Sequence, residues 1–213
     1  MLAGAALGAA LPANVAQRAT APLAAVEREA TLVELRANPG RYLGEDVCFV
    51  LQFKRAIEDW NPYLSRFGPR DWLALEAWPD ELFTWEPEVF ASPAPRLFVR
   101  RGGAPEELVK RAHTYQRFEA RARVREAFLG EPWIEIVELV PQEGEVGEGT
   151  ILHVERARDF AFEQHYDLAL EQYERAKAAP LPMHALAALE KEILETREAE
   201  EEAELAQGKG RRH

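Results

Sequence analysis

Arginines and aromatic residues are the side chains of this sequence whose types and spacing suggest binding chemistry. Four arginines occupy odd positions of one segment: Arg117, Arg121, Arg123 and Arg125. An extended strand would place all four on one face, as a basic stripe suited to phosphate groups. Rings on which bases or sugars could stack precede them: Trp60, Tyr63, Trp72 and Trp85. These eight residues form the candidate binding surface.

The overall charge argues against nucleic acid as the ligand of that surface. The chain has a net charge of −11, and residues 31–149 hold 15 basic and 21 acidic residues. A chain this acidic repels a phosphate backbone unless its cations gather on one face. We expect the arginines to pair instead with neighbouring glutamates, for which the candidates are Glu119, Glu126, Glu135 and Glu138.

The sequence carries no catalytic or cofactor-binding motif of the common kinds. GxGxxG, P-loop, CxxC, HExxH and GxSxG patterns do not occur. The five histidines lack metal-ligand spacing, and Cys48 lies in an apolar run where it is expected to pack as a small hydrophobe. We therefore predict a protein that is not an enzyme and uses no cofactor and no metal.

The N-terminal residues 1–30 are alanine-rich and predict a flexible arm or the remnant of a signal segment. Leu2–Leu11 is as apolar as the core of a signal peptide, but no lysine or arginine precedes it. A cytoplasmic location is therefore slightly favoured, and export to the periplasm stays open. This run is too short to span a membrane, and no later run is long enough.

Residues 31–141 predict a domain of short strands and helices. Thr31 and Glu34 have capping-box spacing, which starts a helix from Leu32 to about Ala37. Alternating apolar residues then predict five strands, at 47–53, 71–77, 96–101, 117–125 and 133–140, with a helix at 105–113 between the third and fourth. In the first strand the odd positions should face the core, and the even face should turn outward from Gln52.

This order resembles the OB-fold, a five-stranded barrel with a helix between strands three and four. The stretch before the first strand resembles that of small bacterial OB domains through Leu35, Asn38, Pro39, Tyr42, Gly44, Val47 and Phe49. The resemblance implies an α+β fold. The segment between Trp60 and Phe90 is rich in prolines and aromatic residues. It either folds back to cap the barrel or forms an exposed binding surface.

Beyond the barrel the pattern changes to a helical one. Residues 142–149, rich in glycine and glutamate, predict a linker that disfavours packing, and residues 150–207 predict helices, followed by a basic tail at 208–213. Tyr166, Ala169, Tyr173 and Ala176 recur at spacings of three and four. This stripe resembles the second half of a TPR repeat, and it should pack on the preceding helix.

Taken together, the patterns predict a non-catalytic adaptor in which the OB-like barrel and the TPR-like helices bind another protein. The alternative is an OB-type ligand-binding protein for an oligosaccharide or single-stranded nucleic acid, with the helices used for docking or oligomerisation. The sequence leaves the oligomeric state and the partner open.

Overall fold

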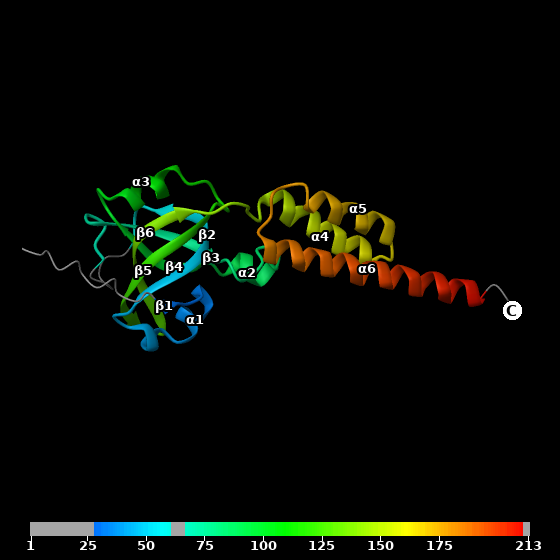
Figure 1. Cartoon of the computed structure of the whole chain (residues 1–213), viewed down its shortest axis with the longest axis horizontal. Coiled ribbons are helices and arrows are strands. Elements are labelled where there is room, and N and C mark those ends of the chain that lie inside the picture. The colour runs from blue at the N-terminus through cyan, green and yellow to red at the C-terminus, as the bar shows by residue number, and fades with distance from the viewer. Residues whose placement is uncertain (1–27, 61–66, 211–213) are drawn as a thin grey trace, which may run out of the picture.

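The computed structural model describes residues 28–60 and 67–210, in which a β-barrel and a helical segment lie at opposite ends of an elongated molecule (Figure 1). The predicted N-terminal arm, apart from its last residues, lies outside the described range, as do residues 211–213 of the predicted basic tail. Residues 208–210 of that tail belong to the last helix.

Five strands of the described residues close into the barrel: β2 (Asp46–Ile57), β3 (Trp72–Pro79), β4 (Ala94–Arg100), β5 (Arg117–Phe128) and β6 (Glu131–Pro141). Their order is β2-β3-β4-β6-β5, and β2 pairs with β5 to close the ring. β4 and β6 run parallel, and the other barrel pairs are antiparallel. The chain is thus α+β, and its barrel is compatible with an OB-like fold.

Shorter elements decorate the barrel. β1 (Arg28–Glu29) adds a parallel edge strand to β2, and α3 (Ala104–Arg111) connects β4 to β5. α1 (Leu32–Ala37) begins with the predicted capping box and is followed by the 3-10 helix η1 (Pro39–Tyr42). Leu32 and Leu35 of α1 are fully buried, so this helix contributes to the barrel core.

The barrel interior follows the predicted alternation. Phe49, Leu51, Ala122 and Val124 are at most 3% exposed and belong to one core cluster, which confirms the inward face of β2 and β5. The outward face of β2 differs from the prediction, because Gln52 is fully buried. Its cross-strand partner Trp78 stacks on Phe90 and Tyr115, so side chains distant in sequence cover this part of the outer wall.

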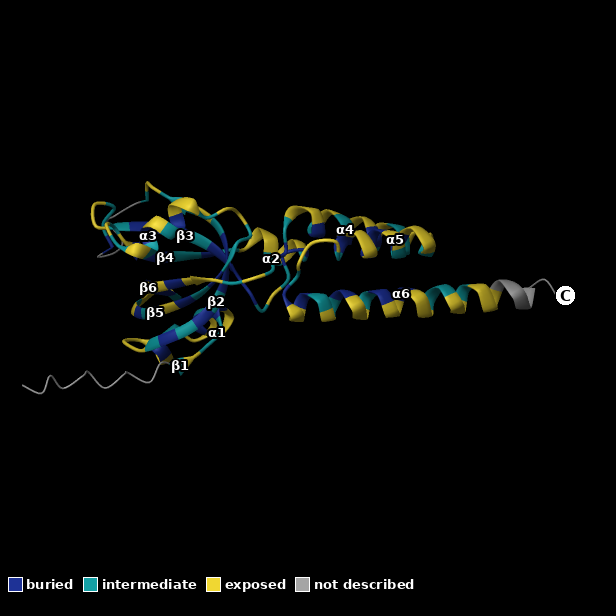
Figure 2. Cartoon of the chain, turned by 45° about the horizontal axis from the view of Figure 1, so that its top comes forward, coloured by how far each residue is buried: buried dark blue, intermediate teal, exposed yellow. Residues whose placement is uncertain are grey.

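The helical segment contains α4 (Glu148–Phe162), α5 (Tyr166–Ala176) and α6 (Met183–Gly210). α4 and α5 lie side by side, and the longer α6 extends past them (Figure 1). Ala169, Tyr173 and Ala176 are at most 3% exposed, which confirms three residues of the predicted α5 stripe, whereas the fourth, Tyr166, is half-buried (Figure 2). They share a core with side chains of the neighbouring helices: Val154 and Ala157 of α4, and Ala185, Leu189 and Ile193 of α6.

The connection between β3 and β4 joins the barrel to the helices. This connection contains α2 (Pro87–Ala91), and just before it Trp85 enters the helical core, where it is 4% exposed and stacks on Phe83. The Thr84 hydroxyl donates to the carbonyl of Val146, and Nε2 of His184 lies 2.7 Å from the carbonyl oxygen of Asp80.

Two residues of the predicted linker 142–149, Gly144 and Val146, make close contacts, although its composition predicts a segment that disfavours packing. Val146 is fully buried in the same core as Trp85, and the Glu145 amide donates to the Pro180 carbonyl at 3.0 Å. Gly144 has φ +74°, and a Cβ at this position would come within 2.9 Å of the Leu181 backbone. Gly144 therefore permits a close approach of two backbone segments.

We expect Phe49→Ala to lower the free energy of unfolding by about 3 to 5 kcal/mol, because it leaves a cavity in the closed barrel. Val137→Ala, at a side chain that is 54% exposed on β6, should change it by less than about 1 kcal/mol. Urea denaturation measures both. A similarly small change for Phe49→Ala would show that the inward face of β2 is assigned wrongly.

We expect Gly144→Ala to destabilise the protein by about 1 kcal/mol or more, since it combines a left-handed backbone with a backbone clash. Gly149→Ala is the matched control, because it lies in α4 with open space around the added Cβ. That change should stabilise by up to about 1 kcal/mol through helix propensity. Equal melting temperatures for the two variants would contradict the packing of residues 142–149.

Candidate functional site

The predicted aromatic surface is largely packed against itself. Phe67 and Phe98 stack with ring centres 4.3 Å apart and form a buried cluster with Ala74 and Trp133 on the barrel's outer wall. Trp60 and Trp72 are half-buried against this cluster. The Trp60 indole also donates to the Phe67 carbonyl at 3.0 Å. Rings that contact one another in this way offer little free face for a base or a sugar.

The other two predicted aromatic residues do not join this cluster. Trp85 is buried in the helical core, so its ring belongs to the junction and not to an open surface. Tyr63 lies outside the described residues. The structure therefore brings together Trp60 and Trp72 and separates them from Trp85.

The arginine stripe of β5 lies on the outer wall, and each arginine has a carboxylate partner. Arg121 pairs with Glu138 at 3.2 Å and Arg125 pairs with Glu135, as two of the expected glutamates. The partners of the other two were not predicted: Arg117 forms a bidentate pair with Asp80, and Arg123 with Asp46. The hydrogen bonds from Arg123 lower the pKa of Asp46 below its ordinary value. The stripe is therefore largely neutralised.

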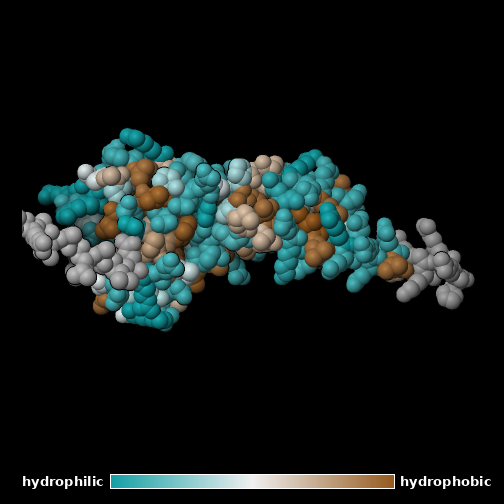
Figure 3. Space-filling view, viewed as in Figure 1, coloured by the Kyte–Doolittle hydropathy of each residue, from teal (hydrophilic) through white to brown (hydrophobic). Residues whose placement is uncertain are grey.

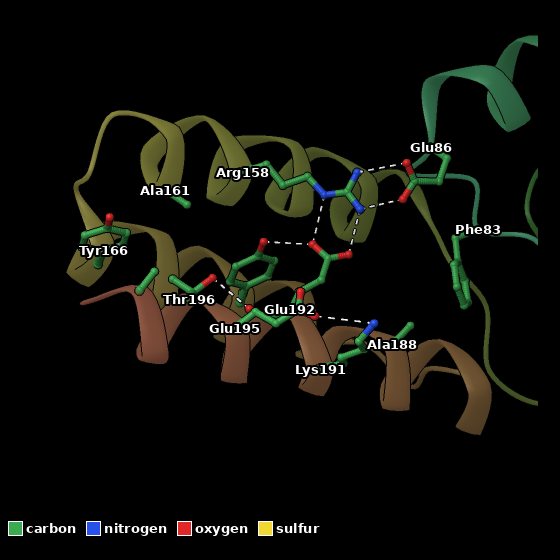
Figure 4. Close-up of a pocket in the computed structure, with 12 residues that line it drawn as sticks. Phe83, Glu86, Arg158, Ala161, Tyr166, Ala188, Lys191, Glu192, Glu195 and Thr196 are labelled. Carbon is green, nitrogen blue, oxygen red and sulfur yellow. Dashed lines mark hydrogen bonds and ion pairs between the residues drawn. The ribbon is translucent and has the colours of Figure 1, made fainter. Parts of the chain in front are cut away.

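A groove in the helical segment is the candidate functional site. It has a volume of about 660 Å³ and lies between α4 and α6, and Tyr166 and Tyr173 of α5 also line it. Small and aromatic side chains line much of it: Ala161, Tyr166, Tyr173, Ala188 and Ala199, with Phe83 from the barrel connection (Figure 4). Hydrophobic surface is visible on this part of the molecule among hydrophilic residues (Figure 3).

Arg158 of α4 fixes the charged side of this groove. Its guanidinium donates to Glu86 at 2.6 Å and to Glu192 of α6 at 2.7 Å, and the Tyr173 hydroxyl donates to Glu192 at 2.9 Å (Figure 4). The hydrogen bonds from Arg158 to these carboxylates raise its pKa. Burial, reinforced by the Glu192 charge, raises the pKa of Tyr173.

These shifts limit the chemistry of the groove near neutral pH. Arg158 stays protonated and Tyr173 stays neutral, so neither supplies a group that gains or loses a proton there. Arg158 bridges the barrel connection and α6, which gives the groove a fixed wall. The arrangement is suited to binding a surface complementary in shape and charge.

One feature of the sequence signals this site: a charged residue on the apolar stripe of a helix. Arg158 follows Val154 by four residues and precedes Ala161 by three, so it lies on the apolar stripe of its helix. A charged residue on such a stripe requires partners. Those partners, Glu86 and Glu192, are 72 and 34 residues away and could not be chosen from sequence.

The described residues show neither a metal-ligand cluster nor a membrane span. Within residues 28–60 and 67–210, no group of three or more histidine, cysteine, aspartate or glutamate side chains is placed to hold a metal ion. Over the same ranges, each helix is too short or too polar to cross a bilayer.

Comparisons with known proteins gave no significant match to a family model, to a curated protein or to a solved structure.

The position of Tyr173 predicts a specific dependence on pH. Because its folded-state pKa lies above the ordinary value of 10.0, unfolding releases a proton at alkaline pH. The stabilising contribution is complete below pH about 10 and declines as the pH rises further. Tyr173→Phe should lose less stability than the parent between pH 9 and about 11 in urea titrations. Parallel losses in both proteins would contradict the assignment.

Proposed function

We propose that this protein is a non-catalytic adaptor whose helical segment binds another protein in the groove between α4 and α6. The observation that carries the proposal is the groove itself, which is open, lined by alanines and aromatic rings, and bounded by a fixed charged wall. Grooves of this kind accept side chains of a partner with little rearrangement.

The arrangement of the helices supports a TPR-like assignment for this segment. α4 and α5 form a hairpin that buries the Ala169 and Tyr173 stripe, and α6 packs on α5 as the first helix of a following repeat would. Helical repeats stack into solenoids that bind partners on extended concave surfaces. The groove lined by α4, α5 and α6 is the concave surface that this proposal assigns to the partner (Figure 4).

The topology of the barrel supports an OB-like assignment. In this proposal the barrel holds the helices in position. Its strand order, its parallel β4–β6 pair and the position of α3 between β4 and β5 agree with that fold. A ligand-binding role for the barrel is the weaker alternative, because the Phe67 and Phe98 cluster and the paired arginines occupy its predicted binding surface.

The test compares two tryptophan substitutions in the full chain. Ala161→Trp fills the groove, whereas Ala178→Trp adds the same side chain at an exposed position that does not line it. We expect a cellular partner, captured by crosslinking, to be retained by the parent and by Ala178→Trp. Its recovery should fall by at least about tenfold with Ala161→Trp, which corresponds to about 1.4 kcal/mol of binding free energy.

Melting temperatures of both variants confirm that they are folded. Equal recovery of every captured protein by the two variants would refute the groove as the binding site. Salt-sensitive binding of single-stranded DNA by the parent, with no protein captured, would instead favour the ligand-binding alternative.

A further inference from the structure

A second groove lies where the barrel meets the first turn of α6. Its volume is about 640 Å³, and it is walled by β1 and α1 on one side and by residues 80–83 with His184 on the other. The apolar side chains that line it include Ala30, Val50 and Phe83, with Cys48 beside them. Phe83 also lines the helical groove, so the two grooves adjoin at this ring.

The rim of this barrel groove carries uncompensated negative charge. Glu34 and Glu81 accept hydrogen bonds from the backbone amides of Thr31 and Val33, which leaves the charge of each carboxylate in place. Two further carboxylates, Glu29 and Glu119, form no ion pair with any residue of the described ranges. Cys48 Sγ is a weak donor 3.7 Å from Glu119 and does not neutralise it.

The neighbouring arginines pair with other groups and leave Glu29 and Glu119 without an ion pair from the described residues, although Arg117 compensates Asp80 at the edge of this groove. Arg28, next to Glu29 in sequence, places its guanidinium 4.8 Å from the centre of the Tyr42 ring. Arg121, two residues after Glu119, pairs with Glu138, and Arg117 pairs with Asp80. The negative potential is thus concentrated in a concave, apolar-floored site, where low-dielectric walls strengthen it.

We infer that the barrel groove binds a basic, extended peptide segment of a partner protein. Side chains of an extended segment alternate in direction, so apolar residues can contact Val50 and Phe83 while lysines or arginines reach Glu29 and Glu119. A second copy of this chain would bring its own negative charge to the site, and nucleic acid or an anionic membrane would be repelled. The barrel groove shares Phe83 with the helical groove, but the inference rests on Glu29 and Glu119, which line only the barrel groove, and does not depend on the proposed function.

The experiment uses the full chain and a fluorescent peptide of alternating lysine and leucine, with anisotropy as the readout. A peptide with glutamate in place of lysine tests the charge requirement. We expect the lysine peptide to bind in a salt-sensitive manner, and Glu29→Lys/Glu119→Lys to weaken binding by at least about tenfold. Glu29→Gln/Glu119→Gln, which removes the two charges without reversing them, should also weaken binding of the lysine peptide. This variant tests the inference if the charge-reversal variant does not fold.

The matched control is Glu201→Lys/Glu204→Lys, which changes the net charge equally at exposed positions near the far end of α6. This variant should bind the lysine peptide as the parent does, and so should Ala161→Trp, which blocks only the helical groove. Equal weakening by the two charge-reversal variants would show a general effect of charge and overturn the inference. Equal binding of the lysine and glutamate peptides by the parent would overturn it as well.

Discussion

The insertion of Trp85 into the helical core is the contact on which the rest of the structure depends. The ring stacks on Phe83 at 4.5 Å and is 4% exposed, and within the described residues its indole nitrogen has no hydrogen-bond partner. Its contribution is therefore burial of a large apolar surface, on the order of 150 to 250 Å² for a ring of this size. Separating the barrel from the helices would expose that surface and break the Arg158–Glu86 pair as well. Both grooves have walls from both parts, so both exist only while this contact holds.

Charge is the second constraint that links the fold to the proposed function. The arginines of β5 form ion pairs on the barrel wall. Arg158 forms ion pairs with Glu86 and Glu192 at the junction between the barrel and the helices. The carboxylates around the barrel groove, such as Glu29 and Glu119, are left without cations from the described residues. An acidic protein that places its cations in structural pairs presents net negative charge to its surroundings, which favours basic partners and disfavours nucleic acid.

Local patterns in the sequence were sufficient for most elements of the fold. The alternation around Phe49 and Leu51, the capping box at Thr31 and the spacing of Ala169 and Tyr173 each reflect a period fixed by backbone geometry. Features that depend on contacts between distant segments could not be predicted. Asp80, in the β3–β4 connection, pairs with Arg117, which is 37 residues away in the sequence. Val146 is buried in the same core as Trp85, although the residues on either side of Val146 in the sequence are glycines and glutamates. The groove around Arg158 could not be predicted from local patterns either, because its walls come from separate parts of the chain.

Urea unfolding of the full chain followed by two probes tests the central claim most directly. All five tryptophans precede residue 134, so their fluorescence reports on the barrel and the junction, whereas far-ultraviolet circular dichroism is dominated by the helices. If Trp85 joins the two parts into one cooperative unit, the two transitions of the parent coincide, and Trp85→Ala separates them. Transitions that are already separate in the parent would contradict the account, because the barrel and the helices would then unfold as independent domains.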